Sequence, residues 1–274
     1  MDAELPKKFE YIRDYFYYDV EAPLEPVIYC TAPSGKEKQT CSSKGCMLDK
    51  GRCPCVKESG RVPYEKDGIL KLEAREPIYE CNSKCVCVDS CRFRVVSRGC
   101  SYSFCIFKTD GERGWGLRAM ERIPKGKFIT TYNGEVVSYK EKNQRDKTEE
   151  EWKTTYMFDL DYNPEENDAE ILAVDARFKG NLARFINHSC TPNLQINPCW
   201  NENQDRRMPL IAFFSNRIIN RGEELTIDYD ARSGEVAEQN RDLLGMIDPS
   251  EFGDPHNATR LCHCGASNCR GFIM

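Results

Sequence analysis

The sequence contains 16 cysteines, and their spacing is the clearest chemical signal in the chain. Nine of them fall between residues 30 and 91, with gaps as short as one residue. A single buried cysteine behaves as a small hydrophobic side chain, but closely spaced cysteines with repeated Cys-x-Cys are typical of bound zinc. The predicted ligands of this first group are Cys30, Cys41, Cys46, Cys53, Cys55, Cys81, Cys85, Cys87 and Cys91.

Nine thiolates fit a cluster of three zinc ions. Each tetrahedral zinc takes four ligands, so nine sulfurs satisfy three ions if three of the sulfurs each bridge two metals. Such a cluster would fasten the loop of residues 56–80 to the rest of the module and replace a hydrophobic core in this apolar-poor segment. Zinc surrounded by thiolates has no open position for water or substrate, so we expect a structural role.

A second group of cysteines closes the chain. Cys262, Cys264 and Cys269 supply three thiolates, one fewer than a closed structural zinc site needs. His263 lies awkwardly between two ligands, so Cys190 is the predicted fourth ligand. With Cys190, the last segment would fold back over the body and complete a pocket there; the alternative is an independent small zinc knuckle.

The expected cellular compartment and the net charge of the protein limit which classes of function are plausible for it. The N-terminal residues lack the pattern of a secretory signal, and no apolar run approaches the roughly 18 residues of a membrane helix. We therefore expect an intracellular protein without a membrane span, in which clustered thiols hold metal rather than form disulfides. The net charge of -5 favours a basic ligand over nucleic acid, although it also fits an ordinary soluble acidic protein.

The region between the two cysteine groups is predicted to consist of short strands, so these strands would position any site there. Runs rich in β-branched and aromatic residues, separated by turn residues, predict a β-rich body over about 100–230. Residues 141–153 are predicted as a helix or exposed insertion and 163–170 as a solvated loop. Residues 232–260 show no clear periodicity of hydrophobic residues and are predicted as a linker that becomes ordered only when ligands bind.

Five motifs in this body resemble those of a known family, in the family's order. They are GWGLR (114–118), TYNGEVV (131–137), YMFDLD (156–161), RFINHSCTPN (184–193) and ELTIDY (224–229). With the cysteine groups before and after them, they resemble the SET-domain lysine methyltransferases with pre-SET and post-SET zinc modules. The resemblance covers about residues 30–274 and is strongest to the suppressor-of-variegation class, which methylates lysine 9 of histone H3.

The resemblance implies a mostly β fold. A SET fold of several small curved sheets with a threaded pseudoknot would be flanked by a trinuclear zinc module and a C-terminal mononuclear zinc segment. The expected parts are an N-terminal wrapping segment (1–29), a pre-SET module (30–98), a SET domain (99–231, with an insertion at about 138–174), and a linker with the post-SET segment (232–274).

One departure from the family concerns the start of the zinc module. The family opens with Cys-x-Cys, whereas Gln39-Thr40-Cys41 lacks the first sulfur. Either Cys30 reaches across the intervening loop, or one zinc has a different set of ligands. Cys100, Cys105 and Cys199 have no ligand role and are expected to be free thiols.

The cofactor implied by the resemblance is S-adenosylmethionine. Gly114, Trp115 and Gly116 would present backbone to it, with glycine allowing close approach, although Gly-x-Gly is also an ordinary strand turn. Asn187 and His188 match the family's cofactor-binding pair, and His188 could instead be a satisfied core histidine. The remaining cofactor residues implied are Tyr156, Arg184 and Phe185, the last as a core anchor.

Methyl transfer depends on positioning. An uncharged amine must approach the sulfonium methyl in line, away from water. The resemblance implies Tyr229 and Tyr132 as catalytic residues, with Tyr229 orienting the amine while the sulfonium lowers the amine's pKa. A phenol with an ordinary pKa of about 10 is poorly matched as a general base, so a water path is at least as plausible. The alternative for Tyr229 is packing at a strand end.

A lysine channel would be lined by Tyr132, Phe158, Ile227 and Tyr229. Aromatic walls can hold the aliphatic stem and tolerate a methylated cationic head. The family usually has Phe or Tyr where Ile227 stands. Because isoleucine is smaller and cannot hydrogen-bond the amine, we predict di- or trimethylation rather than monomethylation.

The predicted substrate is a histone H3 tail, added to a sheet edge as an extended strand. Asp159 and Asp161 could attract such a basic tail, although a solvated acidic face is an equal explanation. We expect a nuclear, chromatin-bound protein, possible chromatin protein partners, and no sequence-specific nucleic-acid binding. The alternatives are a non-catalytic SET scaffold, a methyltransferase for another lysine, and a zinc-rich nucleic-acid binder.

Overall fold

The computed structural model describes residues 9–23, 46, 54–111, 113–149, 156–162, 171–203, 205–230 and 260–273. Three predicted zinc ligands, Cys30, Cys41 and Cys53, lie outside these residues, as do the predicted loop 163–170 and nearly all of the predicted linker 232–260. Strands dominate the part that is described, in two four-stranded and four two-stranded sheets. The prediction of a mostly β fold built from several small sheets is confirmed.

The first four-stranded sheet has the order β3-β12-β13-β6. Strands β12 (Leu194–Trp200) and β13 (Leu210–Ser215) are antiparallel, and β6 (Phe128–Tyr132) continues the antiparallel pattern beyond β13. Strand β3 (Ile78–Tyr79) comes from the cysteine-rich module and pairs in parallel with β12. The module is therefore joined to the body through a shared sheet.

The second four-stranded sheet has the order β2-β7-β9-β8. It comprises β2 (Phe16–Tyr17), β7 (Glu135–Val137), β9 (Ala173–Asp175) and β8 (Met157–Asp159). The N-terminal segment thus contributes an edge strand, and its other strand, β1 (Glu10–Tyr11), pairs with β10 (Lys179–Gly180). These pairings place the N-terminal segment along the surface of the body.

Three strand pairs complete the body and the C-terminal segment. Strands β4 (Phe104–Lys108) and β5 (Trp115–Ala119) form an antiparallel hairpin, while β15 (Arg260–Leu261) pairs with β16 (Phe272–Ile273). Strands β11 (Asn187–His188) and β14 (Thr226–Ile227) pair in parallel. The parallel pair brings together two of the recognised motifs, as the predicted pseudoknot requires.

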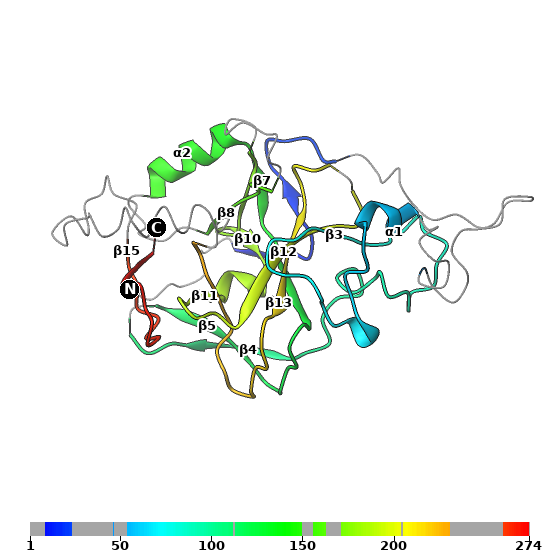
Figure 1. Cartoon of the computed structure of the whole chain (residues 1–274). Helices are drawn as coiled ribbons and strands as arrows, with labels where there is room; N and C mark the ends of the chain where they lie inside the picture. The colour runs from blue at the N-terminus through cyan, green and yellow to red at the C-terminus, as the bar shows by residue number, and fades with distance from the viewer. Residues whose placement is uncertain are drawn as a thin grey trace, which may run out of the picture.

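Helices are short among the described residues. Helix α2 (Tyr139–Glu149) confirms the helix expected in the insertion and lies beside the N-terminal strands, with Arg145 over the ring of Tyr18 (4.5 Å) (Figure 1). The others are α1 (Pro54–Ser59) and the 3-10 helices Lys66–Gly68 and Leu182–Phe185. No described helix is long and apolar enough to cross a membrane.

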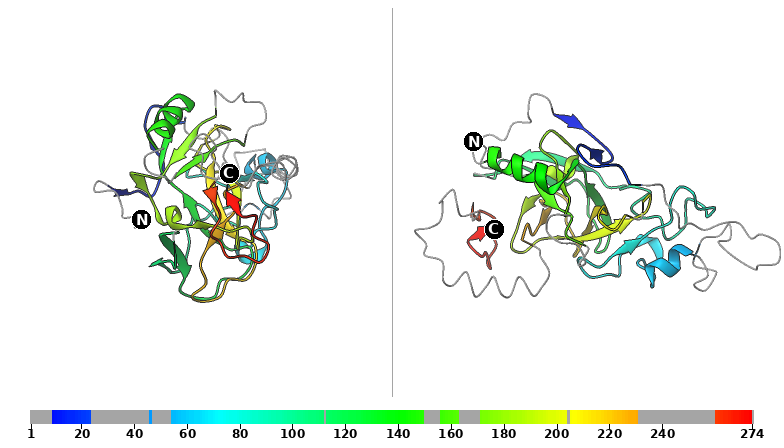
Figure 2. Two further views of the ribbon diagram at one scale, coloured as in Figure 1. Left: turned by 90° about the vertical axis from the view of Figure 1, so that its left-hand side faces the viewer. Right: turned by 90° about the horizontal axis from the view of Figure 1, so that it is seen from above.

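The two groups of cysteines lie at opposite ends of the body. Helix α1 and its cysteine-rich module lie on one side in Figure 1, and the C-terminal segment lies on the other. The view from above in Figure 2 shows the same separation, with the body between them. The expectation of two metal sites that flank a body agrees with this arrangement.

The cysteine-rich module has more hydrophobic packing than we expected. Its fully buried side chains Tyr64 and Ile78 pack in one cluster with Phe128 and Phe214 of the body. The expectation that metal replaces a hydrophobic core is therefore wrong for residues 64–96. It holds only for the thiol-rich part, where the buried side chains other than cysteine are reduced to Phe93.

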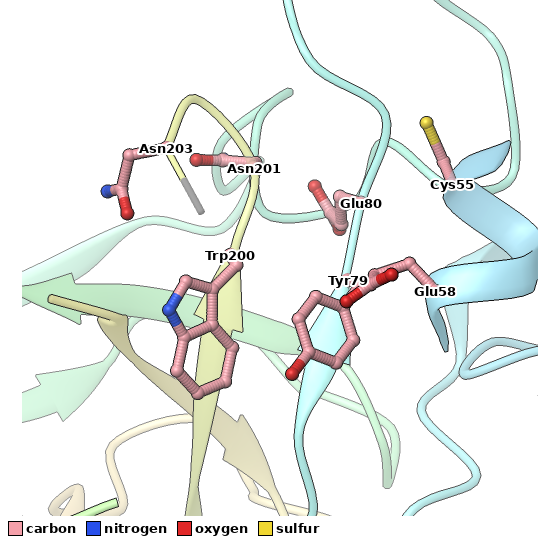
Figure 3. A pocket seen from close by; sticks show the side chains of 7 residues that line it. All are labelled: Cys55, Glu58, Tyr79, Glu80, Trp200, Asn201 and Asn203. Atoms are coloured by element: carbon pink, nitrogen blue, oxygen red, sulfur yellow. The ribbon is translucent and has the colours of Figure 1, made fainter. Parts of the chain in front are cut away.

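A buried carboxylate joins three segments of the cysteine-rich module. Glu80, only 3% exposed, accepts hydrogen bonds from the backbone N–H groups of Val95 and Val96 (both 2.8 Å) and Ser97 (3.1 Å), and from the Tyr64 hydroxyl (2.7 Å). Figure 3 shows Glu80 at a small hollow beside the stacked rings of Tyr79 and Trp200, whose centroids are 5.2 Å apart.

Candidate active site and zinc centres

The described thiols of the N-terminal module form two overlapping groups. The sulfurs of Cys46, Cys81, Cys87 and Cys91 all lie within 4.8 Å of one another, and those of Cys55, Cys81 and Cys85 form a second such group. The closest pairs are Cys46 with Cys81 (3.3 Å) and Cys55 with Cys85 (3.5 Å). Because Cys81 belongs to both groups, its sulfur occupies the place of a ligand that bridges two metals.

The electrostatics of this cluster favour ionised sulfur. Neighbouring thiols, with Cys46 and Cys81 first, hydrogen-bond the Cys91 sulfur and lower the pKa of that thiol. All of the described thiols in the cluster are buried. A buried anion requires compensation, and thiolate-bound zinc supplies it. The donor set therefore fits zinc.

The second thiol group joins the C-terminal segment to the body. The sulfurs of Cys190, Cys262, Cys264 and Cys269 lie within 4.8 Å of one another. Cys190 and Cys262 are 3.8 Å apart, and tetrahedral zinc with Zn–S bonds of about 2.3 Å places its sulfurs about 3.8 Å apart. The prediction that Cys190 is brought to the C-terminal thiols is confirmed, and the independent knuckle is not what the structure shows.

Backbone amides support these sulfurs. The N–H of Arg270 donates to the Cys190 sulfur (3.3 Å), and the N–H of Gly271 donates to the Cys269 sulfur (3.4 Å). Hydrogen bonds from outside the ligand shell orient ligands and stabilise their charge. The C-terminal thiols are thus arranged as a metal site with its supporting donors in place.

His188 lies between this metal site and Tyr229. Its Nδ1 accepts a hydrogen bond from the Tyr229 N–H (3.1 Å), and its Nε2 is 3.3 Å from the Cys190 sulfur. The side chain is buried, and burial lowers the pKa of His188 to about 4, so the ring is neutral near pH 7. Both ring nitrogens face protein groups, which matches the reading of His188 as a satisfied core histidine and leaves its cofactor role a prediction.

Asn187 is fixed by two acceptors. Its Nδ2 donates to the backbone oxygen of Trp115 (3.1 Å) and to Oε1 of Glu224 (2.9 Å). Glu224 in turn pairs with Arg113 (2.8 Å). These bonds tie Asn187 to the start of β5, so two of the segments predicted to bind the cofactor lie side by side.

The glycines before and within β5 have different roles. Gly114 has a φ of 71°, the left-handed region that favours glycine, and ends the turn into the strand. Gly116 lies inside β5, where an added Cβ would meet Glu224 Oε1 at 2.8 Å and Phe107 Cε1 at 2.9 Å. Close packing within the protein is therefore enough to require glycine at 116.

Arg184 is buried among aromatic rings. Its guanidinium lies 4.2 Å from the ring centroid of Tyr156, 4.8 Å from that of Phe9 and 5.1 Å from that of Phe185. Its Nε donates to the backbone oxygen of Ala176 (3.0 Å). Arg184, Tyr156 and Phe185 are thus brought together, as expected if they border one site.

The residues predicted to line a lysine channel also meet. The rings of Tyr132 and Phe158 are 5.6 Å apart, and Tyr132 and Ile227 belong to one buried cluster against which Phe158 packs. The Tyr132 hydroxyl donates to the backbone oxygen of Tyr156 (2.6 Å), and burial raises the pKa of Tyr132 well above its ordinary value. Tyr132 therefore stays protonated at neutral and mildly alkaline pH.

Tyr229 lies at the open side of this group. Its side chain is 50% exposed, and its hydroxyl donates to the backbone oxygen of Ile186 (2.8 Å). Tyr132 lies near enough to interact electrostatically with it. A buried aromatic and aliphatic wall thus adjoins a half-exposed tyrosine, a geometry that can accept a long apolar side chain with a polar head.

Comparison with known proteins identifies the family. The SET domain matches residues 114–230, and the Pre-SET motif matches residues 1–94. The structure superimposes on the Neurospora SET domain protein DIM-5, a histone lysine methyltransferase, with a TM-score of 0.71 and 30% identity, covering 85% of this chain and 93% of that one. The chain belongs to the SET-domain family.

Two further relatives bear on ligands and on chain length. Histone-lysine N-methyltransferase SUV39H1 of Xenopus laevis is 37% identical over 270 residues, which cover 93% of this chain and 62% of that protein. KRYPTONITE, solved in complex with DNA, an H3(1-15) peptide and SAH, matches with a TM-score of 0.73 and 27% identity, covering 97% of this chain and 48% of that one. The chain thus spans about half to three-fifths of the length of these two relatives.

The acidic residues expected to attract a basic tail are already paired with cations of this chain. Lys142 of helix α2 donates to both carboxylate oxygens of Asp159 (2.6 and 2.8 Å). Arg75 pairs with Asp161 (3.2 Å). A basic peptide would have to displace these cations, so neither carboxylate is a ready-made attractor.

Several residues around the SET-domain site were not anticipated from the sequence. Phe9 packs on Arg184, Glu224 holds Asn187, and Arg270 binds Asp228 and Asp230 on either side of Tyr229. The ELTIDYD run does carry a signal for the last pair, because two carboxylates flank one tyrosine. Phe9 carries no such signal, because only the tertiary fold brings it to Arg184.

Proposed function

We propose that the protein is an S-adenosylmethionine-dependent lysine N-methyltransferase that acts on a histone H3 tail, with lysine 9 as the target. The observation that carries the proposal is the buried wall of Tyr132, Phe158 and Ile227 beside the half-exposed Tyr229. The likeness to DIM-5, to SUV39H1 and to KRYPTONITE with its H3 peptide supports the same activity and substrate. A nuclear, chromatin-bound location follows from a histone substrate.

The proposed cofactor site lies where the motif segments converge. The cofactor supplies an activated methyl group on a sulfonium. Asn187 is held against β5 and its neighbour His188 is locked by Tyr229, so the binding segment is rigid before a ligand arrives. The residues proposed to border the cofactor are Gly114, Trp115, Gly116, Tyr156, Arg184, Phe185, Asn187 and His188.

The channel residues would position the acceptor amine and exclude water. Tyr132 and Phe158 would contact the aliphatic stem, while the Tyr229 hydroxyl would exchange its bond to the Ile186 oxygen for one to the amine. The Tyr132 hydroxyl is protonated and donates a hydrogen bond to the backbone oxygen of Tyr156. Tyr132 therefore acts as a fixed part of the channel wall rather than as a base. The proton of the lysine would leave through water.

We propose di- or trimethylation as the outcome. Ile227 is 3% exposed and pairs in register with His188, so its side chain forms part of the buried wall. It carries no hydroxyl that could hold a partly methylated amine in an unproductive orientation. The channel can therefore accept the lysine again after the first transfer.

The zinc content proposed is three ions in the N-terminal module and one in the C-terminal segment. Cys30, Cys41 and Cys53 would complete the first set, and Cys190, Cys262, Cys264 and Cys269 form the second. The module boundaries proposed are 1–29, 30–98, 99–231 with its insertion at 138–174, and 232–274. Other chromatin proteins are possible partners through parts of the molecule outside the site.

A methyl-transfer assay tests the function. We expect the protein to transfer methyl groups to an H3(1-15) peptide, to lose activity when lysine 9 alone is replaced, and to keep it when lysine 4 is replaced. Tyr229→Phe should lower kcat at least about 100-fold while the Kd for S-adenosylmethionine stays within about threefold. A protein that binds the peptide and the cofactor but transfers nothing would be the non-catalytic scaffold instead.

The matched control for that variant is Tyr11→Phe. Tyr11 lies on β1, is 57% exposed and is far in sequence from the motif segments. Its substitution should leave kcat unchanged. Binding to DNA that weakens steeply with salt, in the absence of methyl transfer, would favour the nucleic-acid binder.

A further inference from the structure

Arg270 of the C-terminal segment forms ion pairs with the two carboxylates that flank Tyr229. Its guanidinium donates to both oxygens of Asp228 (2.8 and 2.6 Å) and to one oxygen of Asp230 (3.0 Å). Arg270 and Asp230 are 40 residues apart in the sequence. The contact therefore joins the C-terminal segment to the end of the motif that carries the proposed catalytic tyrosine.

The same contacts reach the backbone of Tyr229. Asp228 Oδ1 accepts from the Asp230 N–H (3.1 Å) and lies 3.5 Å from Nδ1 of His188, the atom that accepts from the Tyr229 N–H. Arg270 thus holds the residue on each side of Tyr229, and His188 holds Tyr229 itself. Together these bonds fix the peptide groups from which the tyrosine ring projects.

The chemistry of the pair suits a clamp. A guanidinium can make two parallel bonds to one carboxylate, and such charge-assisted pairs are stronger and more directional than neutral ones. Asp228 and Asp230 are 21% and 15% exposed, and without a cation between them their charges would repel. Arg270 itself is 34% exposed, so the contact lies near the surface.

We propose that Arg270 is a positioning residue, an ionic clamp distinct from the zinc thiolates, that docks the C-terminal segment and sets the orientation of Tyr229. The clamp acts through Asp228 and Asp230 and does not touch the transferred methyl. Its effect on turnover rests on the proposed function, whereas its effect on docking does not.

The test compares Arg270→Gln, Arg270→Lys and the control Arg207→Gln. Arg207 makes a similar fork to Asp205 on the body (3.0 and 2.8 Å), and neither of these residues neighbours Tyr229 in the chain. For each purified full chain, zinc per molecule, amide hydrogen exchange and the kinetics of methyl transfer to the H3(1-15) peptide are measured. Arg270→Lys keeps the charge without the two-pronged geometry, so it separates charge from orientation.

Arg270→Gln should keep the zinc content of the unaltered protein, because all four thiolates remain. Exchange should accelerate across 260–273 and at Tyr229, and kcat should fall by about tenfold with a smaller change in KM. Arg270→Lys should recover part of kcat, and Arg207→Gln should match the unaltered protein. The double variant Asp230→Asn with Arg270→Gln should raise the activation free energy of turnover by less than the sum of the two single changes, because both substitutions remove the same contact.

Unchanged exchange in 260–273 together with unchanged kcat in Arg270→Gln would overturn the clamp. Loss of one zinc in that variant would also overturn it, because Arg270 would then act through the metal site. If the unaltered protein transfers no methyl group, the proposed function fails. The exchange comparison still decides the clamp in that event.

Discussion

The guanidinium of Arg184 lies 4.2 Å from the ring centroid of Tyr156, and the backbone oxygen of Tyr156 accepts the hydroxyl of Tyr132. A buried cation is thus linked through one residue to the wall of the proposed lysine channel. Phe9 also packs on this cation, with its ring centroid 4.8 Å from the guanidinium. The N-terminal segment, which contains none of the recognised motifs, is therefore part of the scaffold of the site.

Phe9→Ala should weaken this scaffold. The substitution removes one of the aromatic rings that pack on the buried Arg184 guanidinium. We expect it to lower the free energy of unfolding by about 1–2 kcal/mol and to raise the Kd for S-adenosylmethionine. Denaturation in urea and calorimetry measure the two effects. Tyr11→Ala, two residues on and exposed, is the control; equal behaviour of the two variants would show that the ring stack does not support the site.

Ile227→Tyr should restrict the product to monomethyl-lysine. The added hydroxyl can hold the amine after the first transfer and also fills space in the buried wall. Ile227→Phe adds bulk without the hydroxyl, and we expect it to keep multiple methylation. Mass spectrometry of the peptide product distinguishes the states, and a monomethyl product from the unaltered protein would contradict the proposal.

Gly116→Ala should disturb Asn187 indirectly. The new Cβ would lie 2.8 Å from Glu224 Oε1, which currently accepts from Asn187 Nδ2. Glu224 must move, so Asn187 loses an acceptor, and we expect a loss of about 1–3 kcal/mol in stability together with weaker cofactor binding. Cys105→Ala on the paired strand removes atoms instead of adding them and serves as the control. A thermal melt and a binding isotherm identical to those of the unaltered protein would rule out the crowding.

Glu80→Gln should destabilise the cysteine-rich module. The amide offers only one acceptor oxygen, so some of the donors from Tyr64 and residues 95–97 are left unpaired in a buried place. We expect the free energy of unfolding to fall by about 2–4 kcal/mol. Glu65→Gln, an exposed position of the same module, should change it little. Chemical denaturation with zinc present checks both variants.

Removing one C-terminal thiolate should remove one metal. Cys264→Ser should reduce the zinc content by one ion per chain, whereas Cys105→Ser should leave it unchanged. Because protons compete with zinc for thiolate, mild acid should also release metal, and neutralisation with added zinc should restore it. Metal analysis by mass spectrometry gives the count, and four thiols that hold no zinc at neutral pH would refute the assignment.

The sequence was most informative where chemistry restricts the choice of residue. Three C-terminal thiols required a fourth, and Cys190 in the Asn-His-Ser-Cys run was chosen because His263 lies awkwardly between two ligands. The local pattern does not mark β12 as a strand, because Asn197 and Pro198 interrupt its run of β-forming residues and proline has no N–H to donate to a sheet. Its neighbours β3 and β13 nevertheless hold it on both sides, and Asn197 is buried with its Nδ2 bonded to the backbone oxygens of Glu73 and Glu76.

The contacts of Phe9, Glu224 and Arg270 could not be predicted, because each depends on distances between segments far apart in the chain. Local pattern shows which residues prefer a strand but not which strands meet. The hydrophobic packing of Tyr64 and Ile78 was missed for the same reason, since their partners Phe128 and Phe214 belong to the body.

Strand β3 connects the N-terminal thiol cluster to the body. It pairs with β12 in the body's sheet and is followed directly by Glu80 and by Cys81 of the cluster. Loss of metal from the N-terminal cluster therefore removes support from one edge of a sheet whose opposite edge, β6, carries Tyr132. Zinc supply in the cell would then set how much of the newly made chain folds completely.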